Sequence, residues 1–126
     1  MLNIELKFKA WNKVTKKIYR SGALSFSTER HSFLLHTDKT VTESKDSDME
    51  IMQYTGQKDV NNKEIYQRDI IEIDESKFII VWDNNKGGWA YTDVERRIRM
   101  TTFGRSEANR CHVVGNQFEN PEMLNP

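Results

Sequence analysis

Two groups of residues in this chain have side chains suited to catalysis or metal binding. Cys111 and His112 are adjacent, and these types can form a nucleophile and its general base. Neighbouring side chains of a strand point to opposite faces, so the sequence favours Cys111 as a small buried residue. His31 and His36 also fall on opposite faces of an expected strand, and no Cys-x-x-Cys or His-x-x-x-His spacing is present. We therefore expect no catalytic residue, no metal and no cofactor.

The carboxylates follow the pattern of a strand. Over residues 68–74, Glu72 and Asp74 lie on one face and Asp69 on the other, in alternation with Ile71 and Ile73. This spacing is typical of the polar face of a half-buried strand. A hydrolytic carboxylate pair would need a partner that the sequence does not show. The chain is not expected to be an enzyme, and enzymatic activity is the third-ranked hypothesis.

Aromatic and arginine side chains give the strongest indication of binding. Two tryptophans flank the turn DNNKGG, and the arginine-rich segment ERRIRMTTFGR follows. If the tryptophans pair across a hairpin, they form either a clasp in the core, which the sequence favours, or an exposed stacking platform. Aromatic faces beside arginines suit nucleic acid or an acidic protein partner. The candidate binding residues are Trp82, Trp89, Tyr91, Arg96, Arg97 and Arg99.

Short strands must position these residues. In LNIELKFKAW, apolar residues at every second position predict one buried and one exposed face. Turn-forming residues recur every 8 to 12 positions, and no segment has a helical period, so we expect a mostly β fold, α+β at most, of short antiparallel strands and hairpins. Further strands are expected over residues 18–27, 31–37, 68–74, 77–83, 89–94 and 109–116, with a helical turn at 119–124. The predicted core includes Leu6, Phe8, Ile71, Ile73, Ile80 and Trp82.

Composition narrows the class of protein. The 126 residues carry 19 Lys and Arg against 19 Asp and Glu, which argues against a general nucleic-acid binder. The single cysteine excludes an internal disulfide, and no apolar run is long enough to span a bilayer. With no hydrophobic signal segment at the start, we expect a cytoplasmic protein. Residues 38–48 are polar and acidic, and we expect them to form a mobile loop between residues 1–37 and residues 49–126.

Three blocks of the sequence resemble the YopX family, small proteins of phages and prophages in Gram-positive bacteria. They are LKFKAWN (6–12), QYTGQKDVNNKEIYQRDII (53–71) and HVVGNQFENPEML (112–124), and they span nearly the whole chain in the family's order. Two positions depart from the family pattern, because Asn62 and Arg68 stand where glycine is usual. Asn62 still suits a tight turn. For Arg68 we expect an ordinary negative φ, with a small shift of the strand entry.

The resemblance implies a fold and an origin but little about function. It implies an SH3-like barrel within residues 49–126, short strands of residues 1–37 packed on it, and no catalytic residue to carry over. The leading hypothesis is a phage-encoded, non-catalytic interaction module in the host cytoplasm, which binds a protein partner or self-associates. The alternative is a weak single-stranded or shape-selective nucleic-acid binder.

Overall fold

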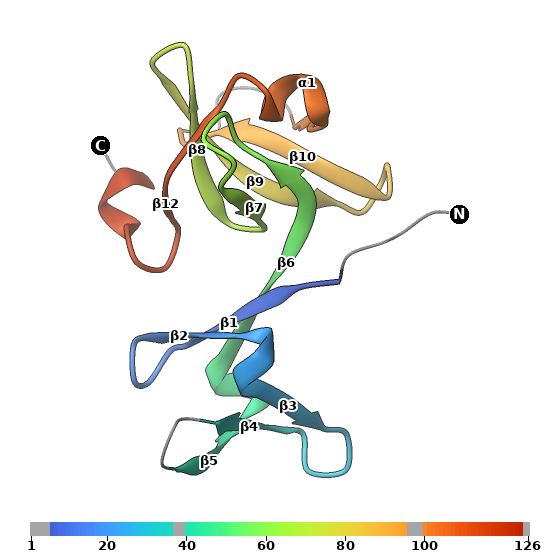
Figure 1. Ribbon diagram of the computed structural model, residues 1–126, viewed down its shortest axis with the longest axis vertical. Helices are drawn as coiled ribbons and strands as arrows, with labels where there is room; N and C mark the ends of the chain where they lie inside the picture. The colour runs from blue at the N-terminus through green and yellow to red at the C-terminus, as the bar shows by residue number, and fades with distance from the viewer. Residues whose placement is uncertain (1–5, 37–39, 96–99, 125–126) are drawn as a thin grey trace. The chain divides into compact units, whose positions relative to one another are not determined.

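The computed structural model describes residues 6–36, 40–95 and 100–124, and most of its elements are short antiparallel strands (Figure 1). The mostly β class is therefore confirmed. Packing divides the chain into two compact units. The N-terminal unit comprises Leu6–Gln53, and the described part of the C-terminal unit is residues 54–95 and 100–124. Strand β6 (Met49–Lys58) contributes residues to both.

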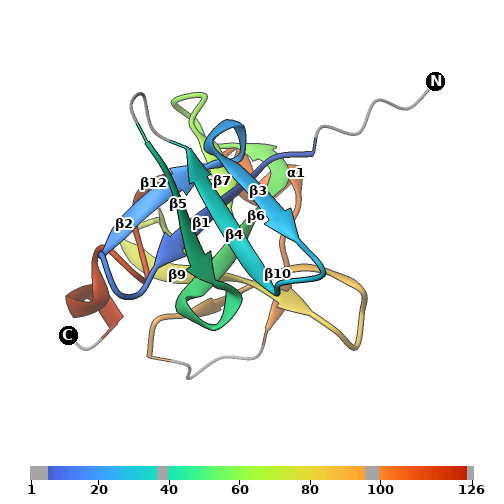
Figure 2. The same ribbon diagram turned by 90° about the horizontal axis from the view of Figure 1, so that it is seen from below.

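The N-terminal unit contains two layers of strands. In one, β1 (Phe8–Asn12) lies between β2 (Lys17–Arg20) and the first half of β6. The other is a three-stranded sheet in which β4 (Ser32–His36) lies between β3 (Leu24–Ser27) and β5 (Val41–Lys45), as Figure 2 shows. Short 3-10 helices occupy Ser21–Ala23 and Asp46–Asp48. The core of this unit contains Ala10, Phe33, Leu35 and Met49, with Tyr19 and Leu24 packed against them.

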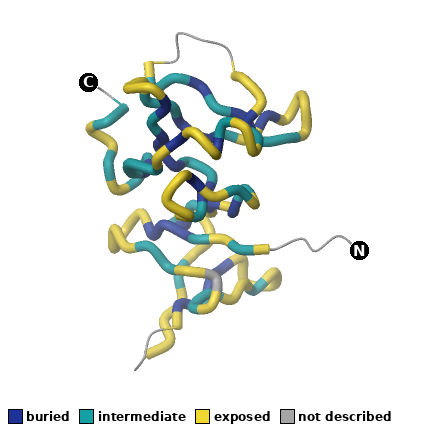
Figure 3. Tube along the Cα trace, turned by 45° about the horizontal axis from the view of Figure 1, so that its top comes forward, coloured by how far each residue is buried: buried dark blue, intermediate teal, exposed yellow. Residues whose placement is uncertain are grey.

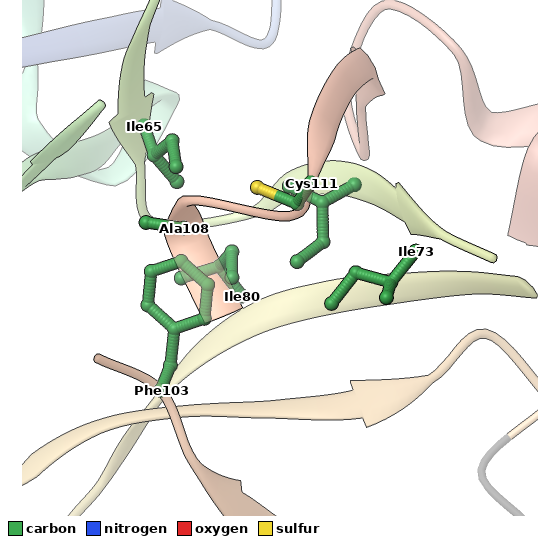
Figure 4. Packing of buried hydrophobic residues seen from close by; sticks show 7 residues of the cluster. Ile65, Ile73, Ile80, Phe103, Ala108 and Cys111 are labelled. Carbon is green, nitrogen blue, oxygen red and sulfur yellow. The ribbon is translucent and has the colours of Figure 1, made fainter. Parts of the chain in front are cut away.

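The C-terminal unit is built on a five-stranded sheet of order β11-β10-β9-β8-β12. Its strands are β8 (Asp69–Ile73), β9 (Ser76–Asp83), β10 (Gly88–Asp93), β11 (Thr101–Thr102) and β12 (His112–Asn116). Strand β7 (Glu64–Tyr66) pairs with β6, α1 spans Arg105–Ala108, and a 3-10 helix at Pro121–Leu124 occupies the predicted helical turn. Figure 4 shows the core formed by Ile65, Ile71, Ile73, Ile80, Phe103, Ala108 and Cys111.

The predicted core is half right. Ile71, Ile73 and Ile80 are buried, as their alternation predicts, and Figure 3 shows the buried stretches along the chain. The prediction was wrong for three residues whose exposed fractions are high: Leu6 (76%), Phe8 (37%) and Trp82 (43%). Alternation identifies the face of a strand, but it does not show where along that face the core ends. Strand β1 begins only at Phe8, and its burial increases towards Asn12.

The segment predicted as a loop at residues 38–48 contains a strand. Residues 37–39 lie outside the described part of the chain, but Val41–Lys45 form β5, which pairs with β4 from His36↔Val41 to Ser32↔Lys45. The sequence prediction was wrong because it followed the polar and acidic residues of the segment, although Val41 and Thr42 are of types enriched in strands, and β4 supplies the pairing partners. The division of the chain into two units falls between Gln53 and Tyr54, and not within this segment. The mobility of the segment remains a prediction.

The expected negative φ of Arg68 is also wrong. Arg68 has φ 72°, and Asn62 has φ 66°, so both positions adopt the left-handed backbone that glycine favours. The backbone around Arg68 is held on both sides. Its N–H donates to the carbonyl of Ile80 at 2.8 Å, and its carbonyl accepts from Gln117 N–H at 2.9 Å. The turn keeps its geometry, and Arg68 carries the strain.

Arg68→Gly is expected to stabilise the protein by up to about 1 kcal/mol. A left-handed non-glycine residue costs roughly 1–2 kcal/mol, and the added freedom of glycine in the unfolded chain offsets about 0.4–1 kcal/mol of the relief. Urea denaturation measures the difference. The matched control is Gln67→Gly, at a neighbour that is not among the positive-φ residues, where a loss is expected. A loss of stability at both positions would contradict the argument.

Candidate binding surface

The β9–β10 hairpin places the two candidate tryptophans directly opposite each other. The register pairs Trp89 with Trp82, and antiparallel partners in register share one face of the sheet. The turn between them is fixed by Asp83, whose Oδ1 accepts from the N–H groups of Asn85 (3.0 Å) and Lys86 (3.3 Å). Gly87 then adopts φ 65°. The local sequence therefore determines both the turn and the pairing of the tryptophans.

The two indoles form an edge-to-face pair with one ring exposed. Their centroids are 5.0 Å apart and their planes are at 80°. Trp89 is half-buried and packs against the core of the C-terminal unit, whereas Trp82 is 43% exposed. The ladder between β8 and β9 ends at Ile70↔Ile79, so among the described strands β10 is the one that pairs with β9 at Trp82. The sequence analysis favoured a core position for both tryptophans, and this prediction was wrong for Trp82. Its ring is exposed to solvent and is supported by Trp89.

Of the other candidate residues, the structure describes Tyr91, which does not join this surface. Tyr91 shares the face of Trp89 but packs inwards, edge-to-face against Phe78 (5.1 Å) and Phe103 (6.2 Å). It supports the core beneath the hairpin. Arg96, Arg97 and Arg99 lie outside the described residues. We define the exposed surface of Trp82, supported by Trp89, as the tryptophan surface.

Asp59 is a buried carboxylate that the sequence analysis did not single out. It connects the turn that follows β6 with strand β12. Asp59 accepts backbone N–H bonds from Asn61 (2.8 Å) and Lys63 (2.9 Å) at Oδ1 and from Val113 (2.9 Å) at Oδ2. Burial alone would raise its pKa, but these donors and the nearby His112 together hold the pKa below its ordinary value. The sequence pattern Asp-x-Asn-Asn is typical of turns in which a side chain accepts backbone hydrogen bonds. This pattern could have identified Asp59 from the sequence. The role of Asp59 is architectural.

Cys111 is expected to be inert in the folded protein. It is fully buried, and burial, together with the charge of Asp59, raises the pKa of its thiol to about 11. A rise of two units from the ordinary 9.0 lowers the thiolate fraction near neutral pH roughly 100-fold. Alkylation by iodoacetamide, followed by mass spectrometry, should be slow in buffer and fast in denaturant. Equal rates in the two conditions would contradict this.

Within the described residues, no group of three or more His, Cys, Asp and Glu side chains gathers as a metal site. His112 is exposed, and its Nδ1 lies 3.2 Å from Asn61 Nδ2. Glu72 faces Lys77, with the charged atoms 3.7 Å apart.

A depression of about 400 Å³ is lined by Glu75, Ser76, Lys77, Asp93, Val94, Glu95 and Met123. No helix in the described part of the chain has the length and apolar character to cross a membrane.

Comparisons with known proteins agree with this fold. A family model described as YopX protein matches residues 7–125. Among solved structures, the chain is similar to the crystal structure of protein EF1440 from Enterococcus faecalis, with a TM-score of 0.69 and 22% sequence identity. The match covers 97% of this chain and 99% of that one. At that identity the likeness shows the fold alone. No curated protein matches the chain.

Proposed function

The chain belongs to the YopX family, and from the geometry of its β9–β10 hairpin we propose that it is a non-catalytic interaction module that binds a protein partner through the tryptophan surface. The observation that carries the proposal is the 43% exposure of Trp82, which forms an edge-to-face pair with Trp89, a ring that is itself packed on the core. Tryptophan is among the residues most enriched at the energetic centre of protein interfaces.

The support beneath Trp82 favours binding. Trp89 fixes the position of the exposed ring, and the hairpin turn is tied by the carboxylate of Asp83. A side chain that is already ordered loses little conformational entropy when a partner covers it. The exposed indole therefore offers a large apolar area that is already in place for contact.

The described residues of the hairpin hold no cluster of positive charge that would support nucleic acid at this surface. The segment from Trp82 to Asp93 contains Asp83, Lys86 and Asp93, which gives one positive and two negative charges, or minus one. Binding to phosphates requires clustered positive charge. Single-stranded or shape-selective nucleic-acid binding, with bases stacked on Trp82, is the second candidate, and the same exposed ring supports it. Enzymatic activity ranks third.

The type of barrel, the origin of the protein and its cellular location are also part of the proposal. The antiparallel five-stranded sheet supports an SH3-like barrel in the C-terminal unit. Membership in the YopX family supports an origin in a phage or prophage and a place in the cytoplasm of the host.

Affinity capture from phage-infected host cells tests the proposal with three proteins. They are the natural chain, Trp82→Ala, and Val60→Ala as a control on the same unit with a similar exposed fraction, 44%. We expect the natural chain and Val60→Ala to retain one protein that Trp82→Ala does not. Identical retention by all three would overturn the proposal.

A titration with a single-stranded oligonucleotide at two salt concentrations distinguishes nucleic-acid binding, the second candidate, from protein binding. Binding at low salt that falls steeply with added salt, and is abolished in Trp82→Ala, would favour nucleic acid. We expect no binding of this kind.

A further inference from the structure

The edges of the three sheets are protected unequally against pairing with another strand. Exposed edge strands are open to intermolecular pairing, and proteins block them with charges, bulges or very short strands. Strands β2, β5 and β7 carry charged residues, β11 has two residues, and β12 contains a register shift between Val113 and Gly115. Strand β3, whose four residues are Leu-Ser-Phe-Ser, has neither a charged residue nor a register shift.

Strand β3 is also the edge with an exposed aromatic ring. Phe26 is 48% exposed, although one side of the ring contacts Phe33 with a centroid distance of 4.8 Å. Ser25 is exposed as well, and no charged residue occurs from Ser21 to Thr28. Within the described residues, β4 is the one strand that pairs with β3. This edge therefore combines open backbone groups, apolar area and the absence of charge.

We propose that β3 pairs antiparallel with β3 of a second copy of this chain, about a two-fold axis at Ser25. Which residues share a face limits the pairing to a two-fold axis that passes through a residue and not between two residues. Leu24 pairs with Leu35 and Phe26 with Phe33, so both β3 side chains lie on the face that carries the core of the N-terminal unit. A continuous sheet across the two copies must keep these faces on one side.

Centring the pair on Ser25 satisfies that requirement and matches the side chains. Leu24 then lies opposite Phe26 of the second copy, and the same contact recurs by symmetry. Ser25 lies opposite Ser25, with hydroxyls on the other face. In this pairing apolar side chains of one copy lie opposite apolar side chains of the other, and serine lies opposite serine. Because β3 contains no charged residue, the pairing brings no like charges together. This self-complementarity identifies a second copy of the chain as the occupant.

The dimer is expected to be weak. Two paired four-residue strands bury less than the roughly 1,200 Å² typical of stable interfaces, so association should appear at high protein concentration. The contact uses the N-terminal unit and is independent of the tryptophan surface. Its failure would leave the proposed function untouched.

A cysteine scan tests the register. Antiparallel partners have Cα atoms roughly 4.5–5.5 Å apart, within the range that a disulfide spans. Ser25→Cys should therefore give a disulfide-linked dimer under mild oxidation, seen on a non-reducing gel. Thr42→Cys, which is exposed on the opposite edge strand β5, should not. No dimer from Ser25→Cys, or equal yields from the two variants, would overturn the proposal.

A charge on the edge tests the association without any cross-link. Sedimentation equilibrium of the natural chain should show an average mass that rises with concentration. Phe26→Lys should remove the rise, whereas Val41→Lys, at a 60% exposed position of β5, should retain it. Circular dichroism verifies that each variant is folded. A natural chain that stays monomeric at the highest concentration would contradict the inference, as would a rise that Phe26→Lys preserves.

Discussion

Replacing Ile80 with alanine is expected to destabilise the protein by about 2–5 kcal/mol, the range for isoleucine truncation in a packed core. Ile80 is fully buried within the cluster that contains Ile71, Phe103 and Cys111. The cavity would open at the centre of the five-stranded sheet, where backbone hydrogen bonds restrict collapse of the surroundings.

Trp82→Ala is the matched control for this substitution, because Trp82 is two residues further along the same strand and on the same face. Trp82→Ala is expected to lower the free energy of unfolding by about 1 kcal/mol, since the truncation chiefly removes the edge-to-face pair with Trp89. Urea denaturation followed by circular dichroism measures both variants. A cost below about 1 kcal/mol for Ile80→Ala would show that the core is placed wrongly.

Removing the carboxylate of Asp59 is the second substitution with a large expected effect. Asp59→Ala leaves three backbone N–H groups without their acceptor. Because hydrogen bonds to charged groups contribute roughly 1.5–3 kcal/mol each, we expect the free energy of unfolding to fall by at least about 3 kcal/mol. Asp59→Asn should cost roughly 1–2 kcal/mol, since an amide oxygen can still accept from Asn61 and Lys63 but the amide nitrogen cannot accept from Val113. Equal stability of the three proteins would contradict this.

The same carboxylate makes stability dependent on pH. The pKa of Asp59 in the folded state lies below its ordinary 3.8. Its contribution is therefore complete above the unfolded pKa, and it disappears as the pH falls through the folded value. The difference in stability between the natural chain and Asp59→Asn should stay constant from about pH 6 to about pH 4, and it should shrink as the pH falls further through the folded pKa. A difference that is unchanged well below about pH 4 would contradict the assignment.

The fold class and part of the core could be predicted from the sequence because both follow from short-range pattern. Alternation identified Ile71 and Ile73 as buried, and Asn62 occupies the left-handed turn that its residue type favours. The same rule failed for Trp82, because the ladder of β8 with β9 ends at Ile79 and Trp82 lies beyond it, where its side chain is exposed. Where a sheet stops is set by tertiary pairing, which no local pattern contains.

Two further errors have the same origin. The strand β5 forms because β4 supplies its partners, although Glu43, Ser44 and Lys45 give the segment a polar pattern without alternation. The left-handed Arg68 persists because hydrogen bonds to Ile80 and from Gln117 hold the turn on both sides. For the binding surface, the sequence identified the paired tryptophans, but the exposure of one of them required the structure.

The measurement that tests the central claim most directly is calorimetric titration of the captured partner into three forms of the chain. The natural protein and Val60→Ala are expected to bind with the same affinity, within about twofold, since a peripheral truncation changes little. Trp82→Ala should bind at least about 30-fold more weakly, which corresponds to a decrease of about 2 kcal/mol or more at a central tryptophan. Unchanged affinity in a folded Trp82→Ala would contradict the account.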